Sequence, residues 1–233
     1  MAATAAAAAT AAAHTGRVFF FDIDNCLYPS SCGIMLAMGQ RIHAYFQRMG
    51  FPDEEASELH RKYYTTYGLA VRGLVKHHDV DPIAYDKEVD QSIPLHEYIS
   101  KDAELRDMLA NMKDVKKWAF TNAYKVHANR VLGALGVEDQ FAGMTFCDYA
   151  IKDFKCKPQE EIYHIAMKAA GVTDPKLCYF VDDSADNVDT AKRLGWTAVH
   201  VVGDNGKKGG SKHGDYQISN VKELPSVLPQ FWT

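Results

Sequence analysis

The stretch Phe19-Phe20-Phe21-Asp22-Ile23-Asp24-Asn25 joins an aromatic run to two carboxylates, and it decides the fold prediction. Residues 18–21 are apolar at every position, which predicts a strand that is buried on both faces, as in a parallel sheet. Three further runs have the same character, at residues 118–120, 178–181 and 197–202. Segments with helical periodicity separate the last three runs. The sequence therefore predicts an α/β fold with a doubly wound parallel sheet.

Two of the predicted helices have clear ends. Residues 126–135 place Val131, Leu132 and Leu135 on one side, and Gly136 follows as a typical C-cap. Residues 159–170 begin directly after Pro158 and end before a glycine. Both lie between the second and third strand-like runs, as an alternation of strand and helix requires.

Polar side chains follow three of the four predicted strands. Asp22 and Asp24 follow the first, Thr121-Asn122 the second, and Asp182-Asp183 the third. Because the carboxyl ends of parallel strands meet at one edge of a sheet, the four aspartates are expected to converge into an acidic pocket. Such a pocket is strained by repulsion unless it holds a cation, and hard oxygen ligands suit Mg²⁺.

Each of these segments has a purely structural alternative. An isolated Asp-x-Asp is typical of a turn or a helix N-cap, and Thr121-Asn122 or Asp182-Asp183 could equally cap a helix. Lys157, before Pro158, would ordinarily be an exposed charge at a helix start. The order of the segments and their position after apolar strands favour a functional site over four unrelated caps.

The four segments resemble, in order, the four motifs of the haloacid dehalogenase-like phosphohydrolases. The first motif resembles residues 21–25, the second Phe120-Thr121-Asn122, the third Lys157-Pro158, and the fourth Val181-Asp182-Asp183-Ser184 with Asp186-Asn187. The resemblance extends from about residue 17 to residue 202. It implies a Rossmann-like core with a helical cap inserted after the first motif.

Three strings resemble one branch of that family, the fungal pyrimidine and pyridine 5'-nucleotidases, also called suppressors of disruption of TFIIS. They are Asp-Asn-Cys-Leu-Tyr-Pro from Asp24, Phe-Thr-Asn-Ala-Tyr from Phe120, and Tyr-Gly-Leu-Ala-Val-Arg-Gly-Leu from Tyr67. In the first motif, Asn25 and Cys26 replace the commoner Gly-Thr, and this change is typical of the branch.

The resemblance and the local patterns together predict three parts of the chain. Residues 1–15 are an alanine-rich tail that we expect to be disordered. Residues 16–32 and 99–233 are expected to form the catalytic core. Residues 33–98 have helical patterning throughout and form the expected cap, which would project over the carboxyl ends of the strands.

Charge considerations assign a role to each motif residue. A phosphate dianion repels a carboxylate nucleophile, so attack by Asp22 requires a cation nearby. Asp24 is the expected general acid and base. The expected Mg²⁺ ligands are Asp22, Asp183 and the backbone carbonyl of Asp24, with Asp182 close by or acting through water. Thr121, Asn122 and Lys157 are expected to bind the phosphoryl group, and Lys157 also to offset repulsion between the aspartates.

The substrate expectation rests on the branch resemblance. The expected substrate is a small phosphate monoester, most specifically a nucleoside 5'-monophosphate. The candidate cap contacts are Tyr63, Tyr67 and Arg72. Another small ester, such as lysophosphatidate or a sugar phosphate, remains an alternative, as do a sugar-phosphate mutase and a non-catalytic regulatory protein. The adjacent His77 and His78 would point in different directions on a helix and are not predicted to bind metal.

Composition excludes several other classes. The 233 residues carry a net charge of −4, which does not favour a nucleic-acid partner. No apolar run reaches the length needed to cross a bilayer, so a membrane partner is not expected.

The sequence contains five cysteines, an odd number, and no two of them have Cys-x-x-Cys spacing. A reducing, cytoplasmic and also nuclear location is therefore expected. The glycine- and lysine-rich residues 203–214 are predicted to be a flexible loop.

Overall fold

The computed structural model describes residues 16–203 and 212–233 of the chain. The predicted tail at residues 1–15 and most of the predicted loop at residues 203–214 lie outside the described residues. Within the described part, no helix combines the length and the apolar character needed to span a membrane.

The described strands form one six-stranded sheet in which every neighbouring pair is parallel, in the order β3-β2-β1-β4-β5-β6. The strands are β1 (Val18–Phe21), β2 (Lys116–Phe120), β3 (Met144–Thr145), β4 (Cys178–Asp182), β5 (Thr197–Val201) and β6 (Tyr216–Ile218). The predicted α/β fold is confirmed, and its four predicted strands are β1, β2, β4 and β5. The two edge strands were not predicted because two or three residues are too few to form a recognisable apolar run.

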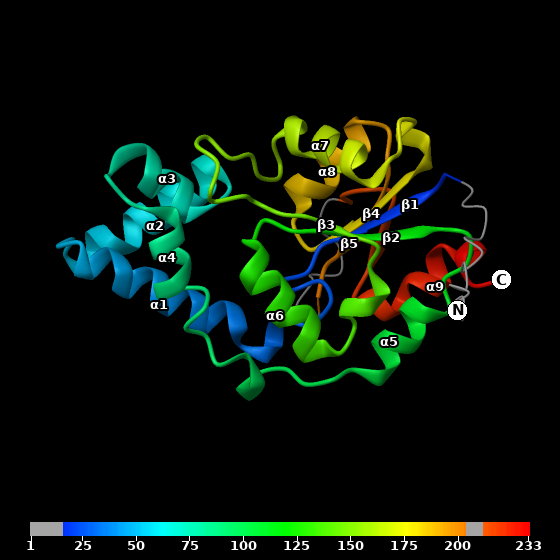
Figure 1. Cartoon of the computed structure of the whole chain (residues 1–233), viewed down its shortest axis with the longest axis horizontal. Coiled ribbons are helices and arrows are strands. Elements are labelled where there is room, and N and C mark those ends of the chain that lie inside the picture. Colours follow the sequence, from blue (N-terminus) through cyan, green and yellow to red (C-terminus); the bar gives the residue numbers. More distant parts are fainter. Residues whose placement is uncertain (1–15, 204–211) are drawn as a thin grey trace, which may run out of the picture.

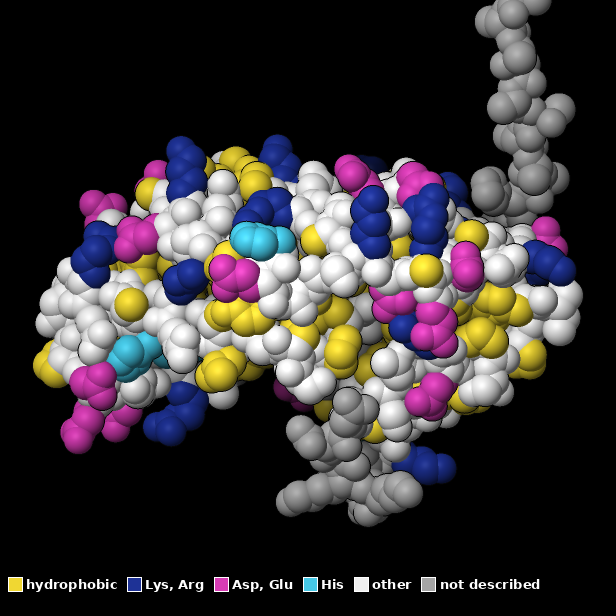
Figure 2. Space-filling model, turned by 90° about the horizontal axis from the view of Figure 1, so that it is seen from below, with side chains coloured by type: hydrophobic (Ala, Val, Ile, Leu, Met, Phe, Trp, Pro, Cys, Tyr) yellow, Lys and Arg dark blue, Asp and Glu magenta, His cyan; other side chains and the backbone are white. Residues whose placement is uncertain are grey.

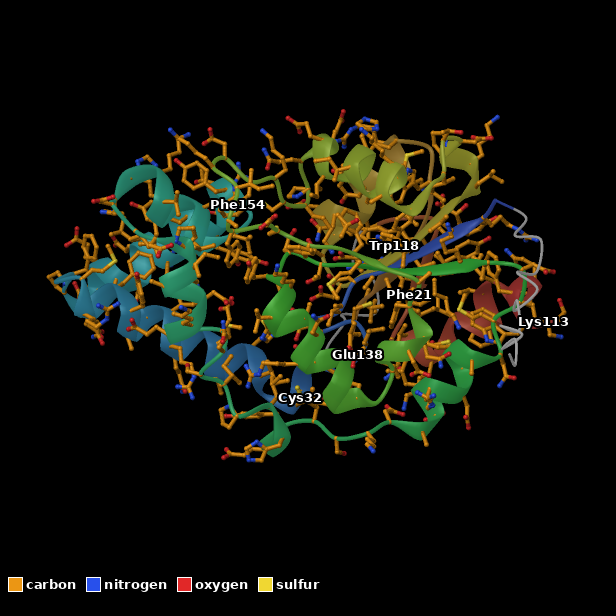
Figure 3. All side chains as sticks on the ribbon, viewed as in Figure 1. Phe21, Cys32, Lys113, Trp118, Glu138 and Phe154 are labelled. Atoms are coloured by element: carbon orange, nitrogen blue, oxygen red, sulfur yellow. The ribbon has the colours of Figure 1, made fainter. Side chains whose placement is uncertain are left out.

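Helices cover both faces of the sheet (Figure 1). On one face lie α7 (Glu160–Ala170) and α8 (Ala185–Arg193), and on the other α5 (Ala103–Ala110), α6 (Lys125–Leu135) and α9 (Leu224–Val227). The alternating side chains of the central strand β1 reach both cores. Phe20 stacks on Trp196 at a centroid distance of 4.6 Å, whereas Phe19 meets Phe231 edge-on at 5.6 Å. In Figure 3, Phe21 and Trp118 mark these two opposite faces.

Residues 33–98, between β1 and β2, are all described by the structure and contain four α-helices and no strand. They are α1 (Ile34–Arg48), α2 (Asp53–Tyr67), α3 (Ala70–His77) and α4 (Pro82–Glu88). In Figure 1 they lie together at the left, beyond the carboxyl ends of the strands. The exact division of the chain into core and cap stays a prediction. Short 3₁₀ helices at Ser30–Cys32, Leu95–Glu97, Glu138–Gln140, Pro175–Leu177, Val221–Glu223 and Pro229–Phe231 complete the described elements.

Gly68, at the C-terminus of α2, allows the inserted helices to approach the core closely. Its φ of +80° is a left-handed conformation that side chains disfavour. A Cβ at this position would also lie 2.8 Å from the carbonyl oxygen of Lys157. The insert therefore approaches the Lys157 segment as closely as a glycine backbone allows.

Candidate active site

A buried lysine links two strand ends at the centre of the site. The Lys157 Nζ donates hydrogen bonds to Asp22 Oδ1 at 2.7 Å, to Asp182 Oδ2 at 2.6 Å and to the Phe120 carbonyl at 2.7 Å. Lys157 is 1% exposed. Burial alone would lower its pKa, but the charges of Asp182 and Asp22 outweigh that effect and raise the pKa above its ordinary value. All three ammonium hydrogens are thus engaged by Asp22, Asp182 and the Phe120 carbonyl, which leaves none for the phosphoryl group that Lys157 was predicted to bind. The lysine lies where it can offset the charges of the two aspartates.

Three carboxylates cluster around this lysine. Single carboxylate oxygens of Asp22, Asp182 and Asp183 all lie within 4.8 Å of one another. Burial raises the pKa of Asp22 well above its ordinary value despite the nearby lysine. Burial and the charge of Asp182 raise the pKa of Asp183 to about 7. Because one lysine cannot balance three carboxylates, this donor set fits a hard divalent cation such as Mg²⁺.

Asp182 and Asp183 differ in how the protein uses them. Asp182 is fully buried, and it accepts hydrogen bonds from the Ser184 amide at 2.7 Å and from Asn187 Nδ2 at 3.0 and 3.1 Å, besides the lysine. Asp183 is only partly buried and lines the adjacent cavity. The geometry therefore gives Asp182 a positioning role and leaves Asp183 as the more available ligand.

Asp24 lies apart from the three-carboxylate cluster. Its Oδ1 accepts a hydrogen bond from the Tyr28 hydroxyl at 2.6 Å and lies 2.9 Å from His127 Nε2. Burial would raise the pKa of Asp24, but the charge and hydrogen bond of His127, together with Tyr28, hold it below its ordinary value. Among the described residues, no side chain is hydrogen-bonded to Oδ2, and 21% of the side chain is exposed. One oxygen is therefore fixed and the other is available to a ligand.

Tyr28 and His127 were not predicted from the sequence. His127 lies on α6, 103 residues from Asp24, and is 1% exposed. The only available signal was a histidine on the apolar side of the predicted helix at residues 126–135, beside Ala128 and Val131. An isolated histidine of that kind does not identify its partner.

The second motif corrects one predicted role. Thr121 lines the cavity, and its Oγ1 accepts the Ala123 amide at 3.0 Å, which leaves its hydroxyl hydrogen free to donate. Asn122 binds the backbone of Lys157 instead, since its Oδ1 accepts the lysine amide at 2.7 Å and its Nδ2 donates to the lysine carbonyl at 2.9 Å. Both ends of the Asn122 amide are thus used to hold Lys157, not to hold a phosphoryl group.

A cavity of about 220 Å³ lies between these strand ends and the inserted helices. Its floor carries Asp22, Asp24, Thr121, Lys157 and Asp183. The remaining lining is largely apolar or aromatic and includes Met38 and Ile42 of α1, Tyr64 of α2, Leu69, Val71 and Tyr149. The cavity thus combines one charged end with walls suited to an apolar or aromatic group.

The three predicted cap contacts do not line this cavity. Tyr63 pairs with His78 at 2.8 Å, Tyr67 pairs with His77 at 2.6 Å, and Arg72 donates to the Tyr67 carbonyl at 3.0 Å. These contacts fasten α2 to α3, and each of the two histidines has a tyrosine partner. Tyr64 faces the cavity instead, because a step of one residue turns a helix by about 100°.

Comparison with known proteins gives a family match. The model of the haloacid dehalogenase-like hydrolases matches residues 17–195. A curated relative, phosphate metabolism protein 8 of Saccharomyces cerevisiae, is 38% identical over 200 residues. That alignment covers 81% of this chain and 62% of the yeast protein, so the chain spans less than two thirds of its relative.

Solved structures share the fold at low sequence identity. A HAD phosphatase from Thermococcus onnurineus matches with 22% identity and a TM-score of 0.59, covering 91% of this chain and 97% of that one. The Bacillus subtilis protein YfnB, solved bound to magnesium, matches with 14% identity and a TM-score of 0.62, covering 91% and 98%. The L-2-haloacid dehalogenase of Xanthobacter autotrophicus matches with 14% identity and a TM-score of 0.59, covering 92% and 99%.

Proposed function

Because this chain belongs to the haloacid dehalogenase-like hydrolase family, we propose that it is a magnesium-dependent phosphomonoesterase with Asp22 as nucleophile. The family predicted from the four motifs is confirmed, and with it a hydrolase. The observation that carries the proposal is the arrangement at the cavity floor, where Asp22 is held by Lys157 while Asp24 stands apart with one oxygen available.

Mg²⁺ would be held by Asp22, Asp183 and the backbone carbonyl of Asp24, with Asp182 close by. The bound ion would supply the positive charge that lets a carboxylate approach a phosphate dianion. The excess of three carboxylates over one lysine supports this part of the proposal.

Asp22 performs the first displacement. Its carboxylate oxygen bonds to phosphorus while the phosphorus–oxygen bond of the ester breaks, which yields an aspartyl phosphate and the leaving alcohol. Lys157 fixes the orientation of the Asp22 carboxylate through Oδ1. The Thr121 hydroxyl donates a hydrogen bond to the transferring group.

Asp24 moves the protons. It donates one to the leaving oxygen, and it then accepts one from the water that hydrolyses the aspartyl phosphate. Burial opposes a charge on His127, but the carboxylate of Asp24 outweighs it and raises the pKa of His127, so the pair retains a proton within 2.9 Å. The low pKa of Asp24 keeps its carboxylate ionised, which is the form that can accept a proton in the second step.

The proposed substrate is a nucleoside 5'-monophosphate, within the broader class of small phosphate monoesters. The motif strings of the nucleotidase branch support this choice, and so do the aromatic walls of the cavity, where Tyr64, Tyr85 and Tyr149 could stack on a base. The yeast relative is named for phosphate metabolism. The five cysteines are all free, which supports the proposed cytoplasmic or nuclear location.

The test is release of inorganic phosphate by the purified protein. Wild type and Asp22→Asn are assayed with p-nitrophenyl phosphate, and wild type is then assayed with UMP, CMP, nicotinamide mononucleotide and several sugar phosphates. We expect Asp22→Asn to reduce turnover by about a thousandfold or more. Near-normal turnover by Asp22→Asn would refute the nucleophile. Equal rates on mononucleotides and sugar phosphates would remove the nucleotide substrate and leave the phosphatase.

A further inference from the structure

The cavity wall contains a buried carboxyl group that the proposed reaction does not use. Asp90 follows α4, is 6% exposed and lines the same cavity as Asp22. Asp86 of α4 is fully buried beside it. Two carboxyl groups at such depth are unfavourable unless they are paired with donors, so the surroundings of Asp90 require an explanation.

The protein supplies few donors to this pair. Arg130 binds the backbone here, donating to the Asp90 carbonyl at 3.2 Å and to the Ile93 carbonyl at 2.7 Å. Gln91 donates to Asp86 Oδ2 at 2.6 Å, while Asp86 Oδ1 is buried without a partner. In residues 16–203 and 212–233, no basic side chain forms an ion pair with the Asp90 carboxyl.

We propose that Asp90 is a specificity-determining residue whose carboxyl group accepts a hydrogen bond from a hydroxyl or amino group of the leaving alcohol. The inference rests on the proposed phosphatase function and deepens it, because it states which chemistry the leaving group carries. An otherwise apolar pocket orients its ligand through a small number of placed polar groups, and Asp90 is such a group outside the phosphate-binding floor.

Asp90 also excludes one class of leaving group. The positive charges near Asp90 are already engaged, since His127 pairs with Asp24 at 2.9 Å and Arg130 donates to the carbonyls of Asp90 and Ile93. A second anionic group in the cavity would therefore face the carboxyl groups of Asp90 and Asp86, which is costly in a site of low dielectric constant. Burial raises the pKa of Asp90 to about 7, and in either protonation state its carboxyl group keeps an acceptor oxygen for the ligand. The selected leaving group is therefore neutral or cationic, with an apolar or aromatic body and at least one hydrogen-bond donor.

The experiment compares substrates that differ in their donors. CMP carries ribose hydroxyls and a base amine, 2',3'-dideoxy-CMP lacks the hydroxyls, UMP lacks the amine, and the leaving group of p-nitrophenyl phosphate has no comparable donor. We expect Asp90→Leu to lower kcat/KM for CMP by about tenfold to a hundredfold, the effect of losing a hydrogen bond to a charged or strongly polar group. Turnover of p-nitrophenyl phosphate should stay within about twofold of wild type.

The remaining analogues locate the donor. If Asp90→Leu does not change kcat/KM for 2',3'-dideoxy-CMP, the ribose hydroxyls are the donors. If it does not change kcat/KM for UMP, the base amine is the donor. Either result supports the proposal. Equal loss on CMP and p-nitrophenyl phosphate would show a merely structural role and overturn it, and so would an unchanged kcat/KM for CMP.

A near-isosteric variant and a matched control distinguish a specific effect of Asp90 from an effect of misfolding. Asp90→Asn keeps the shape and one acceptor oxygen and should show the same pattern at smaller size. Glu88→Gln makes the same change of charge two residues away, on an exposed side chain paired with Arg48, and should leave all rates unchanged.

Calorimetric binding of the leaving group separates this inference from the proposed function. Cytidine should bind wild type more tightly than it binds Asp90→Leu, whether or not the protein hydrolyses any ester. If wild type releases no phosphate but shows this difference, the phosphatase proposal fails and the Asp90 site stands. If phosphate is released and cytidine binds both proteins equally, the Asp90 inference fails alone.

Discussion

The strand-end site and the inserted helices line the same cavity, yet they contribute different kinds of side chain to it. At the strand ends the charged side chains are buried and bonded to one another, with Lys157 joining Asp22 and Asp182. Across the cavity, α1 and α2 present apolar and aromatic side chains, and Tyr64 is 56% exposed. In the proposed reaction, the chemical step would depend on charges held at the strand ends, whereas the leaving group would be selected by side chains of the inserted helices.

The exterior differs from both regions. Figure 2 shows acidic and basic side chains intermixed over the face that it draws. A mixed surface of this kind does not attract a polyanion, in agreement with the small net charge of −4. Over the described part of this face, charges of one sign are therefore not gathered as the three carboxylates are at the strand ends.

The largest expected effect comes from removing the cation, which tests the proposed role of the carboxylates at the strand ends. Exhaustive chelation should reduce phosphate release by about a hundredfold or more, and added Mg²⁺ should restore it. Mg²⁺ should also raise the melting temperature of wild type, because it binds the folded cluster alone. Asp183→Asn should abolish that shift. Full activity after chelation would contradict the magnesium role.

The affinity for Mg²⁺ should depend on pH in a defined direction. Burial and the charge of Asp182 raise the pKa of Asp183 to about 7, so at lower pH a proton competes with the cation. Affinity should therefore rise from about pH 6 to about pH 8 and then level off. Titration calorimetry at three pH values measures it, and an affinity that falls over this range would be inconsistent with Asp183 as a ligand.

The next largest effect concerns Asp24, which separates proton transfer from the metal cluster. Asp24→Asn should lower turnover of a mononucleotide by about a hundredfold to a thousandfold. The loss on p-nitrophenyl phosphate should be smaller, because p-nitrophenolate is a stable anion that leaves without a proton. Asp186→Asn, an exposed carboxylate of the fourth motif, is the matched control and should retain near-normal rates. Equal loss on both substrates would argue against the general acid.

Lys157 tests whether the strand-end charges also stabilise the fold. Lys157→Met keeps the stem but leaves Asp22 and Asp182 without their cation, and it should lower the free energy of unfolding by about 3–5 kcal/mol without Mg²⁺. Added Mg²⁺ should recover part of this loss. Lys155→Met, which removes a half-exposed charge 3.8 Å from Glu161, should cost less than about 1 kcal/mol in urea denaturation. Similar losses for both variants would mean that the buried triad adds no stability.

The same contrast explains how much could be predicted from the sequence. The aromatic strand before Asp22 and the polar residues after β2 and β4 are local signals, and strand geometry alone brings them to one edge. The sheet and the clustering of Asp22, Asp182 and Asp183 could therefore be predicted. Lys157 follows no strand, and only the motif resemblance assigned it to the site. The partner of Asp24 could not be predicted, because His127 comes from a distant helix and no local pattern joins the two.

Helix phase limited the prediction for the inserted helices. Tyr63 and Tyr67 are four residues apart and share the side of α2 that packs on α3, whereas Tyr64 points to the cavity. Several tyrosines on one helix carry no information about which side meets the core until the neighbouring helices are placed. The structural role of Asn122 had the same origin, since its two hydrogen bonds depend on where the Lys157 backbone comes to lie.

The smallest expected effect tests the helix side of the comparison. Tyr64 lines the cavity together with Asp22 and Asp183, and partial burial and the charges of Asp183 and Asp182 raise the pKa of its hydroxyl. Tyr64→Ala should raise KM for a mononucleotide by about threefold to tenfold, since a stacked base is lost, with kcat little changed. Tyr67→Phe, which breaks only the contact with His77 outside the cavity, should leave both constants near wild type. If Tyr67→Phe raises KM as much as Tyr64→Ala does, substrate reaches the opposite side of α2, and the helices contribute to binding through a surface other than this cavity.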